Sequence, residues 1–137
     1  MWQREYSIET TASAETIWKI FSDVPGWKHW NAGIEEISIR GPFALNTEFV
    51  MQPPGQAALT SRLVQVRENE LFEDETIVGD IRVLVAHRIE RLDSGRVRIT
   101  YAANVFGPEA EEVGTAVTAD FPDVLQSLVR LAERSGE

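Results

Sequence analysis

Three side chains of this sequence have the chemistry to exchange protons with a small molecule: His87, Tyr101 and Tyr6. An imidazole acts as a general acid or base near neutral pH, and a phenol hydroxyl can donate a hydrogen bond to a carbonyl. We therefore take these three as candidate catalytic residues. A purely structural role for all three also stays open. In that case His87 would form a hydrogen bond to a neighbour in the core, and both tyrosines would be ordinary strand residues with solvent-exposed hydroxyls.

Acidic side chains occur in three runs, Glu73-Asp74-Glu75, Glu35-Glu36 and Glu109 to Glu112. In a strand, neighbours point to opposite faces, so Glu73 and Glu75 share a face and Asp74 lies on the other. Charge runs of this kind usually form solvated surface. The run at Glu109 suits the start of a helix, where the helix dipole favours negative charge.

The totals restrict the possible functions. The chain has 137 residues, which predicts one domain over residues 1–137, and 43% apolar residues, which is enough for a single core. With no cysteine and only two histidines, we expect no metal site, and we expect no cofactor. A net charge of -9 makes nucleic acid a poor partner. No signal peptide or membrane span is visible, so we expect a cytoplasmic protein, either monomer or homodimer.

A long amphipathic helix is predicted over Glu109 to Arg134. Its apolar residues recur at spacings of three and four, which places them on one face. Pro122 should kink this helix, and Gly114 should loosen its first half. We expect the second half to anchor on a sheet and the first half to cover a cavity. The residues on the apolar face are Val113, Val117, Phe121, Leu125, Leu128 and Leu131.

The rest of the chain alternates between apolar and polar residues, as strands do. A first strand over Trp2 to Thr10 is followed by a helix with Ser13 as its N-cap, and then by a short helix or turn over Gly26 to Asn31. Gly79-Asp80 predicts a tight hairpin. The six further strands are predicted over Ile34 to Arg40, Thr47 to Gln52, Ala58 to Arg67, Leu71 to Val78, Ile81 to Leu92 and Arg96 to Phe106.

Strand parity predicts which side chains face the core. In the strand from Ile81 the odd positions are apolar, so His87 should point inward, and the same argument places Tyr101 inward. In the strand from Leu71 either of two alternating sets of side chains could face the core, the set that begins with Leu71 or the set that begins with Phe72. We prefer the second, which places Asp74 inside, because it buries one acid instead of two.

The order of these elements resembles the helix-grip fold of the START-like (SRPBCC) superfamily, in particular its polyketide cyclase/dehydrase-like branch. The resemblance covers nearly the whole chain, and each motif alone is weak. One departure is Asn46-Thr47, where relatives often have Gly-Thr. The matching segments are Ala14 to Trp18, Phe21 to Asp23, Trp27 to Asn31, Ala86 to Glu90, Ser94 to Tyr101, Phe106 to Pro108 and Asp120 to Glu133.

The resemblance implies an α+β fold with a seven-stranded curved antiparallel sheet wrapped around a long C-terminal helix, and two short helices between the first two strands. It also implies a cavity between sheet and helix that binds an apolar or aromatic molecule such as a lipid or polyketide. The expected ligand-binding residues are Tyr6, Trp27, Trp30, Phe49, Met51, His87, Tyr101, Val117, Phe121 and Leu125.

Two other functions stay open at this point. The first is a metal-free cyclase/dehydratase-like lyase or isomerase that uses His87 with Tyr101 or Tyr6 as acid-base groups. The second is an interaction module, which would expose an apolar patch and have no cavity.

Overall fold

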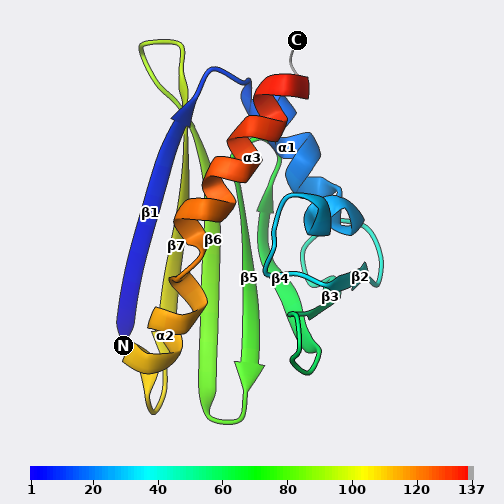
Figure 1. Ribbon diagram of the computed structural model, residues 1–137, viewed down its shortest axis with the longest axis vertical. Coiled ribbons are helices and arrows are strands. Elements are labelled where there is room, and N and C mark those ends of the chain that lie inside the picture. The colour runs from blue at the N-terminus through cyan, green and yellow to red at the C-terminus, as the bar shows by residue number, and fades with distance from the viewer. Residues whose placement is uncertain (136–137) are drawn as a thin grey trace.

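A single antiparallel sheet of seven strands forms one layer of the protein, in the order β1-β7-β6-β5-β4-β3-β2. The computed structural model describes residues 1–135. Figure 1 shows α2 and α3 crossing one face of the sheet in front of β1, β7 and β6. The strands are β1 Trp2–Thr10, β2 Glu36–Ile39, β3 Glu48–Gln52, β4 Leu59–Arg67, β5 Leu71–Val78, β6 Ile81–Arg91 and β7 Val97–Phe106.

Two short helices connect β1 to β2, as predicted. The first, α1 (Ala14–Ser22), begins at Ser13, whose hydroxyl accepts a hydrogen bond from the Thr16 amide at 3.1 Å. The second is η1 (Val24–His29), a 3-10 helix. His29 at its end is exposed, as expected. The two helices lie on the same side of the sheet as α3 (Figure 1).

The C-terminal helical segment has a break that the sequence reading placed wrongly. It consists of α2 (Ala110–Thr118) and α3 (Phe121–Ser135), separated by a turn at Ala119 and Asp120. Pro122 does not kink a continuous helix; it lies in the first turn of α3, where its missing N–H costs nothing because that N–H would have no helical partner. The Val124 amide makes the first backbone bond of α3, to the Asp120 carbonyl at 2.9 Å.

Strand register confirms the preferred face of β5. Phe72 is 1% exposed and lies toward the helices, whereas Leu71 packs with two alanines, Ala86 and Ala102, on the opposite face. We call the helix-covered side the inner face. A bulge between Leu63 and Gln65 shifts the register between β4 and β5.

The outer face carries a buried acid, because two arginines cover it. Glu75 is 8% exposed and makes ion pairs with Arg62 at 3.1 Å and Arg82 at 2.6 Å. The three residues come from neighbouring strands, β4, β5 and β6. Glu75 therefore belongs to a charge network on the outside of the sheet, separate from the inner face.

The hydrophobic core fills the space between the inner face and the helices. Trp18 lies in it at 8% exposure. No helix among residues 1–135 is both long enough and apolar enough to cross a membrane. The largest fully buried apolar side chains are Phe21, Phe49, Phe72, Ile17, Leu63, Ile99, Leu125 and Leu128.

Candidate functional site

Strand pairing brings the predicted acid-base residues into one row on the inner face. Tyr6 of β1 pairs with Tyr101 of β7, Tyr101 pairs with His87 of β6, and His87 pairs with Phe72 of β5. Paired residues of an antiparallel sheet have neighbouring side chains on the same face. The fold therefore brings together the three residues that were predicted from the sequence, Tyr6, Tyr101 and His87.

His87 lies between aromatic rings. Its imidazole stacks on Phe72 with ring centroids 3.9 Å apart and an interplanar angle of 7°, and it meets the Tyr101 ring edge-on at 4.5 Å. Nδ1 lies 3.3 Å from the Phe72 carbonyl oxygen, which favours the tautomer with the proton on Nδ1. Burial lowers the pKa of His87 to about 3. His87 is therefore a neutral imidazole at physiological pH.

Asp74 is the inner-face group that titrates near neutrality. Its side chain is 13% exposed, and Oδ2 lies 4.0 Å from Nδ1 of His87. Burial, assisted by the charge of Glu73, raises the pKa of Asp74 to about 7. The sequence reading missed this residue as a functional candidate because it lies within an acidic run; the parity of β5, which placed it inside, was the available signal.

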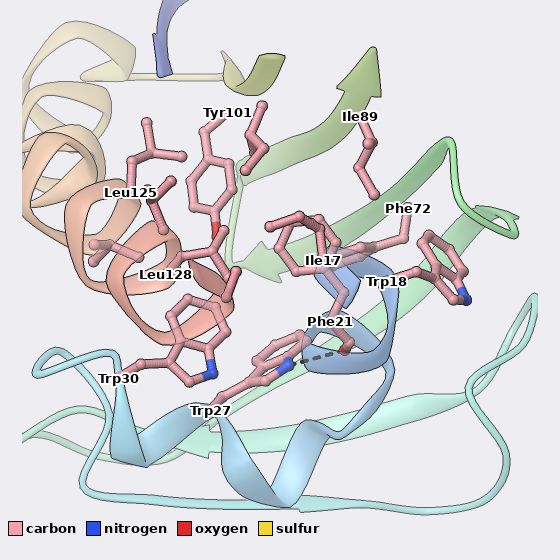
Figure 2. Packing of buried hydrophobic residues seen from close by; sticks show 14 of the residues in the cluster. Ile17, Trp18, Phe21, Trp27, Trp30, Phe72, Ile89, Tyr101, Leu125 and Leu128 are labelled. Atoms are coloured by element: carbon pink, nitrogen blue, oxygen red, sulfur yellow. Dashed lines mark hydrogen bonds between the residues drawn. The ribbon is translucent and has the colours of Figure 1, made fainter. Parts of the chain in front are cut away.

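The Tyr101 hydroxyl is the second polar group of this region. Tyr101 is 4% exposed, and its ring extends from β7 toward Leu125 and Leu128 of α3 (Figure 2). Burial and the negative charges of Asp74 and Asp120 raise the pKa of this hydroxyl above its ordinary value. Among residues 1–135 the hydroxyl has no recorded hydrogen-bond partner, and neither has the Asp74 carboxylate.

These two unpartnered groups keep contact with accessible space. In the part of the chain that the structure describes, every fully buried side-chain nitrogen and oxygen has a hydrogen-bond partner. The small exposed fractions of Tyr101 and Asp74 therefore include their polar atoms. Two polar groups on an apolar inner face that have accessible area and no protein partner are available to a ligand.

Asp120 contributes a second carboxylate from the turn between α2 and α3. A side chain on Gly33 would come within 2.8 Å of the Asp120 carboxylate, so the loop after η1 approaches it closely. That loop is fixed by a hydrogen bond from the Gly33 amide to the Asn31 side chain at 2.9 Å. Partial burial raises the pKa of Asp120. Asp120 therefore lies against this loop, and we call Asp74 and Tyr101 alone the polar group of the inner face.

The two tryptophans that were expected to bind a ligand, Trp27 and Trp30, are buried. The Trp27 indole donates to the Phe21 carbonyl at 2.9 Å, drawn as a dashed line in Figure 2, and stacks on Phe72 with centroids 5.6 Å apart. Trp30 packs edge-on against Trp27 at 6.5 Å. Trp27 is 6% exposed and Trp30 is 9% exposed, so both hold the short helices on the sheet.

The other predicted ligand-binding residues divide by burial. Phe49, Leu125 and Phe121 belong to the core, at 2%, 1% and 8% exposure. Met51 and Val117 are half-buried at its margin. Tyr6 is half-buried and meets the Phe121 ring edge-on at 6.4 Å. Contact of these residues with a ligand stays a prediction.

Two surface hollows lie away from the predicted cavity. One of about 510 Å³ lies over β1, β7 and β6 and includes Arg88, Ala102 and Asn104. A smaller one of about 160 Å³ lies beside β2 and β3, at Ile37 and Val50. Neither lies between the inner face and α3, where aromatic side chains pack against one another.

No lysine or arginine among residues 1–135 is buried. The two lysines of the chain, Lys19 and Lys28, are both exposed. Arg4 has the inward parity of β1 but is exposed, with its guanidinium over the Trp2 ring at 4.9 Å. Residues 1–135 also contain no cluster of three His, Cys, Asp or Glu side chains suited to hold a metal.

Solved structures of low sequence identity share this fold. A START superfamily protein from Mycobacterium smegmatis superposes with a TM-score of 0.76 at 18% identity, over 96% of this chain and 97% of that one. Norcoclaurine synthase from Thalictrum flavum, in complex with dopamine and hydroxybenzaldehyde, gives 0.74 at 18% identity over 97% and 87%. The protein XoxI from Bacillus cereus gives 0.80 at 14% identity over 96% of both chains.

Sequence comparison identifies the family. No curated protein matches the chain significantly. A family profile described as polyketide cyclase / dehydrase and lipid transport matches residues 1–133. This match covers almost the whole chain. The seven strands and the long C-terminal helical segment have the helix-grip arrangement. The chain belongs to the polyketide cyclase / dehydrase and lipid transport family.

Proposed function

We propose that this domain binds an apolar or aromatic small molecule between the inner face of the sheet and the helices α2 and α3. The observation that carries the proposal is the polar group of the inner face. The Tyr101 hydroxyl and the Asp74 carboxylate have no protein partner although their side chains are 4% and 13% exposed. A partner from outside the protein would satisfy them, with apolar residues all around its body.

Access to this region would come from the side of α2. Val85 on β6 and Thr76 on β5 have inward parity but are half-buried, and so is Val117 on α2. The turn at Ala119 and Asp120 interrupts the helix hydrogen bonds, so α2 can move separately from α3. A ligand would enter beneath α2 by displacing half-buried side chains, while α3 stays on the core.

The relatives agree with a ligand of this kind. The family description includes lipid transport and polyketide cyclisation, both of which concern largely apolar molecules. Norcoclaurine synthase, whose fold this chain shares, is described with two small aromatic molecules, dopamine and hydroxybenzaldehyde. These facts support an aromatic or apolar ligand class and leave its polar end undefined.

Fluorescence titration with Nile red, a neutral apolar dye, tests the proposal. We expect saturable binding to the protein and at least tenfold weaker binding to Val85→Trp, whose indole would occupy the inner face beside Asp74, the strand partner of Val85. Leu84→Trp is the matched control, since Leu84 is a half-buried neighbour on the outer face of the same strand. An unchanged affinity in a folded Val85→Trp variant, or no binding to the wild type, would refute the proposal.

A second candidate function is acid-base catalysis of the cyclase/dehydrase kind, and Asp74 favours it more than His87 does. A carboxylate with a pKa of about 7 can remove a proton beside a ketone and return it, whereas an imidazole with a pKa of about 3 is a weak base. NMR can follow the exchange of such C–H protons for deuterium in an aromatic ketone. Wild-type protein should accelerate the exchange, and Asp74→Asn should remove the acceleration.

A further inference from the structure

We infer that Trp2 is a latch that holds α2 closed over the inner face, and that a ligand enters when this contact opens. The inference rests on the proposed function, because it concerns entry to the same site. Three observations carry it: the contact between Trp2 and Gly114, the shallow burial of the rest of α2, and the breaks in the helical backbone at both ends of α2.

The indole of Trp2 packs directly against the backbone of α2. Trp2 begins β1 and is half-buried, and Gly114 lies buried in the middle of α2. A Cβ atom at position 114 would overlap the six-membered ring of the indole, so glycine leaves the room that this contact needs. The Arg4 guanidinium lies over the same ring at 4.9 Å and adds a cation–π interaction. Trp2 therefore connects the edge strand β1 to α2.

The rest of α2 has little to hold it on the sheet. In the described part of the chain, the one hydrogen bond made by a side chain of α2 stays inside the helix, from the Thr118 hydroxyl to the Gly114 carbonyl at 2.9 Å. Apart from these two buried residues, all side chains of α2 are half-buried or exposed. The attachment of α2 therefore depends strongly on the one large ring that the helix covers.

The neighbouring helix α3 is fastened far more firmly. It buries six residues, and its Glu133 carboxylate accepts a hydrogen bond from the buried Thr10 hydroxyl at 2.8 Å. Thr10 ends β1 and Trp2 begins it, so the two helices are attached to opposite ends of one strand (Figure 1). Opening of α2 would expose little buried area, whereas opening of α3 would expose the core.

The backbone at both ends of α2 allows this helix to move as a unit. Glu109, which precedes it, has a left-handed conformation with a φ of 58° and makes no side-chain capping bond. At the other end Pro122 offers no N–H to the Thr118 carbonyl, and the turn at Ala119 and Asp120 separates α2 from α3. Once Trp2 leaves Gly114, α2 can therefore rotate about these two points while α3 stays in place.

Amide hydrogen exchange measures the latch without any ligand. In Trp2→Ala, the amides of residues 113–118 should exchange at least about tenfold faster than in the wild type, because α2 opens more often. The amides of residues 125–129 in α3 should change less than about twofold. Gln3→Ala alters an exposed neighbour on the outer face of β1 and should change neither. Unchanged exchange of α2 in a folded Trp2→Ala variant would overturn the inference.

Stopped-flow fluorescence with Nile red measures the role of the latch in entry. With Trp2→Ala, association and dissociation should both be at least about fivefold faster, because opening of α2 serves both directions. The dissociation constant should change less than about threefold, since both rates rise together. Gln3→Ala should keep the wild-type rates. Unchanged rates in a Trp2→Ala variant whose α2 exchanges faster would show that the dye enters elsewhere, and would overturn the inference.

Gly114→Ala tests the same contact from the side of the helix and leaves Trp2 in the chain. Its methyl group would displace the indole, so it should accelerate α2 exchange and dye entry in the same direction as Trp2→Ala. Because both changes break one contact, the double variant should behave about like Trp2→Ala alone. Slower exchange or slower entry in Gly114→Ala would contradict the latch.

The two readouts separate the inference from the function on which it rests. If Nile red binds the wild type but Trp2→Ala changes neither exchange nor rates, the proposed function stands and the latch fails. If Nile red does not bind the wild type, the proposed function fails, and entry beneath α2 fails with it even where exchange shows that Trp2 holds the helix.

Discussion

Oδ2 of Asp74 lies 4.0 Å from Nδ1 of His87 on the inner face of the sheet, and of the two it is the aspartate that titrates near neutral pH. Burial disfavours the charged form of both groups, so it raises the pKa of the acid and lowers the pKa of the base. Both groups are therefore neutral between about pH 3 and pH 7, and Asp74 is negatively charged above about pH 7. This relationship changes which residue is expected to exchange protons with a ligand.

NMR titration should show these two pKa values directly. The imidazole of His87 should stay neutral from pH 8 down to about pH 4, because its pKa is about 3. The side-chain carboxyl ¹³C signal of Asp74 should instead titrate near pH 7. A His87 that protonates near pH 6 would show that the region is wetter than its contacts indicate.

The variant Asp74→Asn should be more stable than the wild type at about pH 8. The pKa of Asp74 is raised from an ordinary 3.8 to about 7, so the folded protein resists ionisation that the unfolded chain permits. A shift of this size corresponds to on the order of 2–4 kcal/mol. The titratable groups near Asp74 are His87 at 4.0 Å, Glu73 beside it in the strand, and Tyr101, on whose hydroxyl the Asp74 charge acts.

Because burial raises the pKa of Asp74, the stability difference between Asp74→Asn and the wild type should depend on pH. Stability associated with Asp74 is present below pH 4 and is lost as the pH rises toward 7. The advantage of Asp74→Asn should therefore disappear near pH 4, where the wild-type carboxyl is also protonated in the folded protein. Urea denaturation at several pH values measures this difference. An advantage that persists unchanged at pH 4 would point to a packing effect of the amide.

Because of His87, the variant Asp74→Asn should lose stability more steeply than the wild type as the pH falls. The folded pKa of His87, about 3, lies below its ordinary 6.5, so stability is lost as the pH falls from 6.5, while the unfolded chain takes up a proton. In the wild type, Asp74 offsets this loss between about pH 4 and 6.5. Without Asp74, urea midpoints should fall across this range, whereas the wild type should change little. Equal slopes in both proteins would contradict these pKa assignments.

Gly114→Ala should destabilise the protein although alanine favours helices. The Cβ would overlap the indole of Trp2, which packs directly on this helix position. Overpacking costs about 1–3 kcal/mol, more than the gain of about 1 kcal/mol from helix propensity. Thermal unfolding measures the effect, with Ala116→Gly on the exposed side of α2 as control. The cost should shrink in a Trp2→Ala background, and an equal cost there would rule out the steric explanation.

Trp27→Phe should cost about 1–3 kcal/mol in free energy of unfolding. It removes the hydrogen bond from the indole to the Phe21 carbonyl and leaves part of a buried volume empty. Chemical denaturation measures the loss. Trp27 connects η1 to α1, so amide exchange should also increase in Val24–His29 before it changes in β7. No change in stability would mean that the indole does not hold the short helices in place.

Periodicity and strand parity determined much of the architecture. Alternation over Leu71 to Val78 and Ile81 to Leu92, joined by Gly79-Asp80, predicted the β5–β6 hairpin, and its pairing of Val78 with Ile81 is confirmed. Parity placed His87, Tyr101 and Phe72 inside correctly, because a strand alternates its side chains strictly between two faces. The C-terminal helical segment was also predicted, except for its break at Ala119 and Asp120.

Only the tertiary structure decided the chemistry of the inner face. In the sequence, Asp74 is one of three adjacent acids, and nothing local separates it from Glu75. In the fold, Glu75 meets two arginines on the outer face, whereas Asp74 is enclosed beside His87 with no counter-charge. A pKa depends on burial and on charges brought near from other strands, which residue spacing along one strand does not contain. That is why sequence reading selected the imidazole and the structure selects the carboxylate.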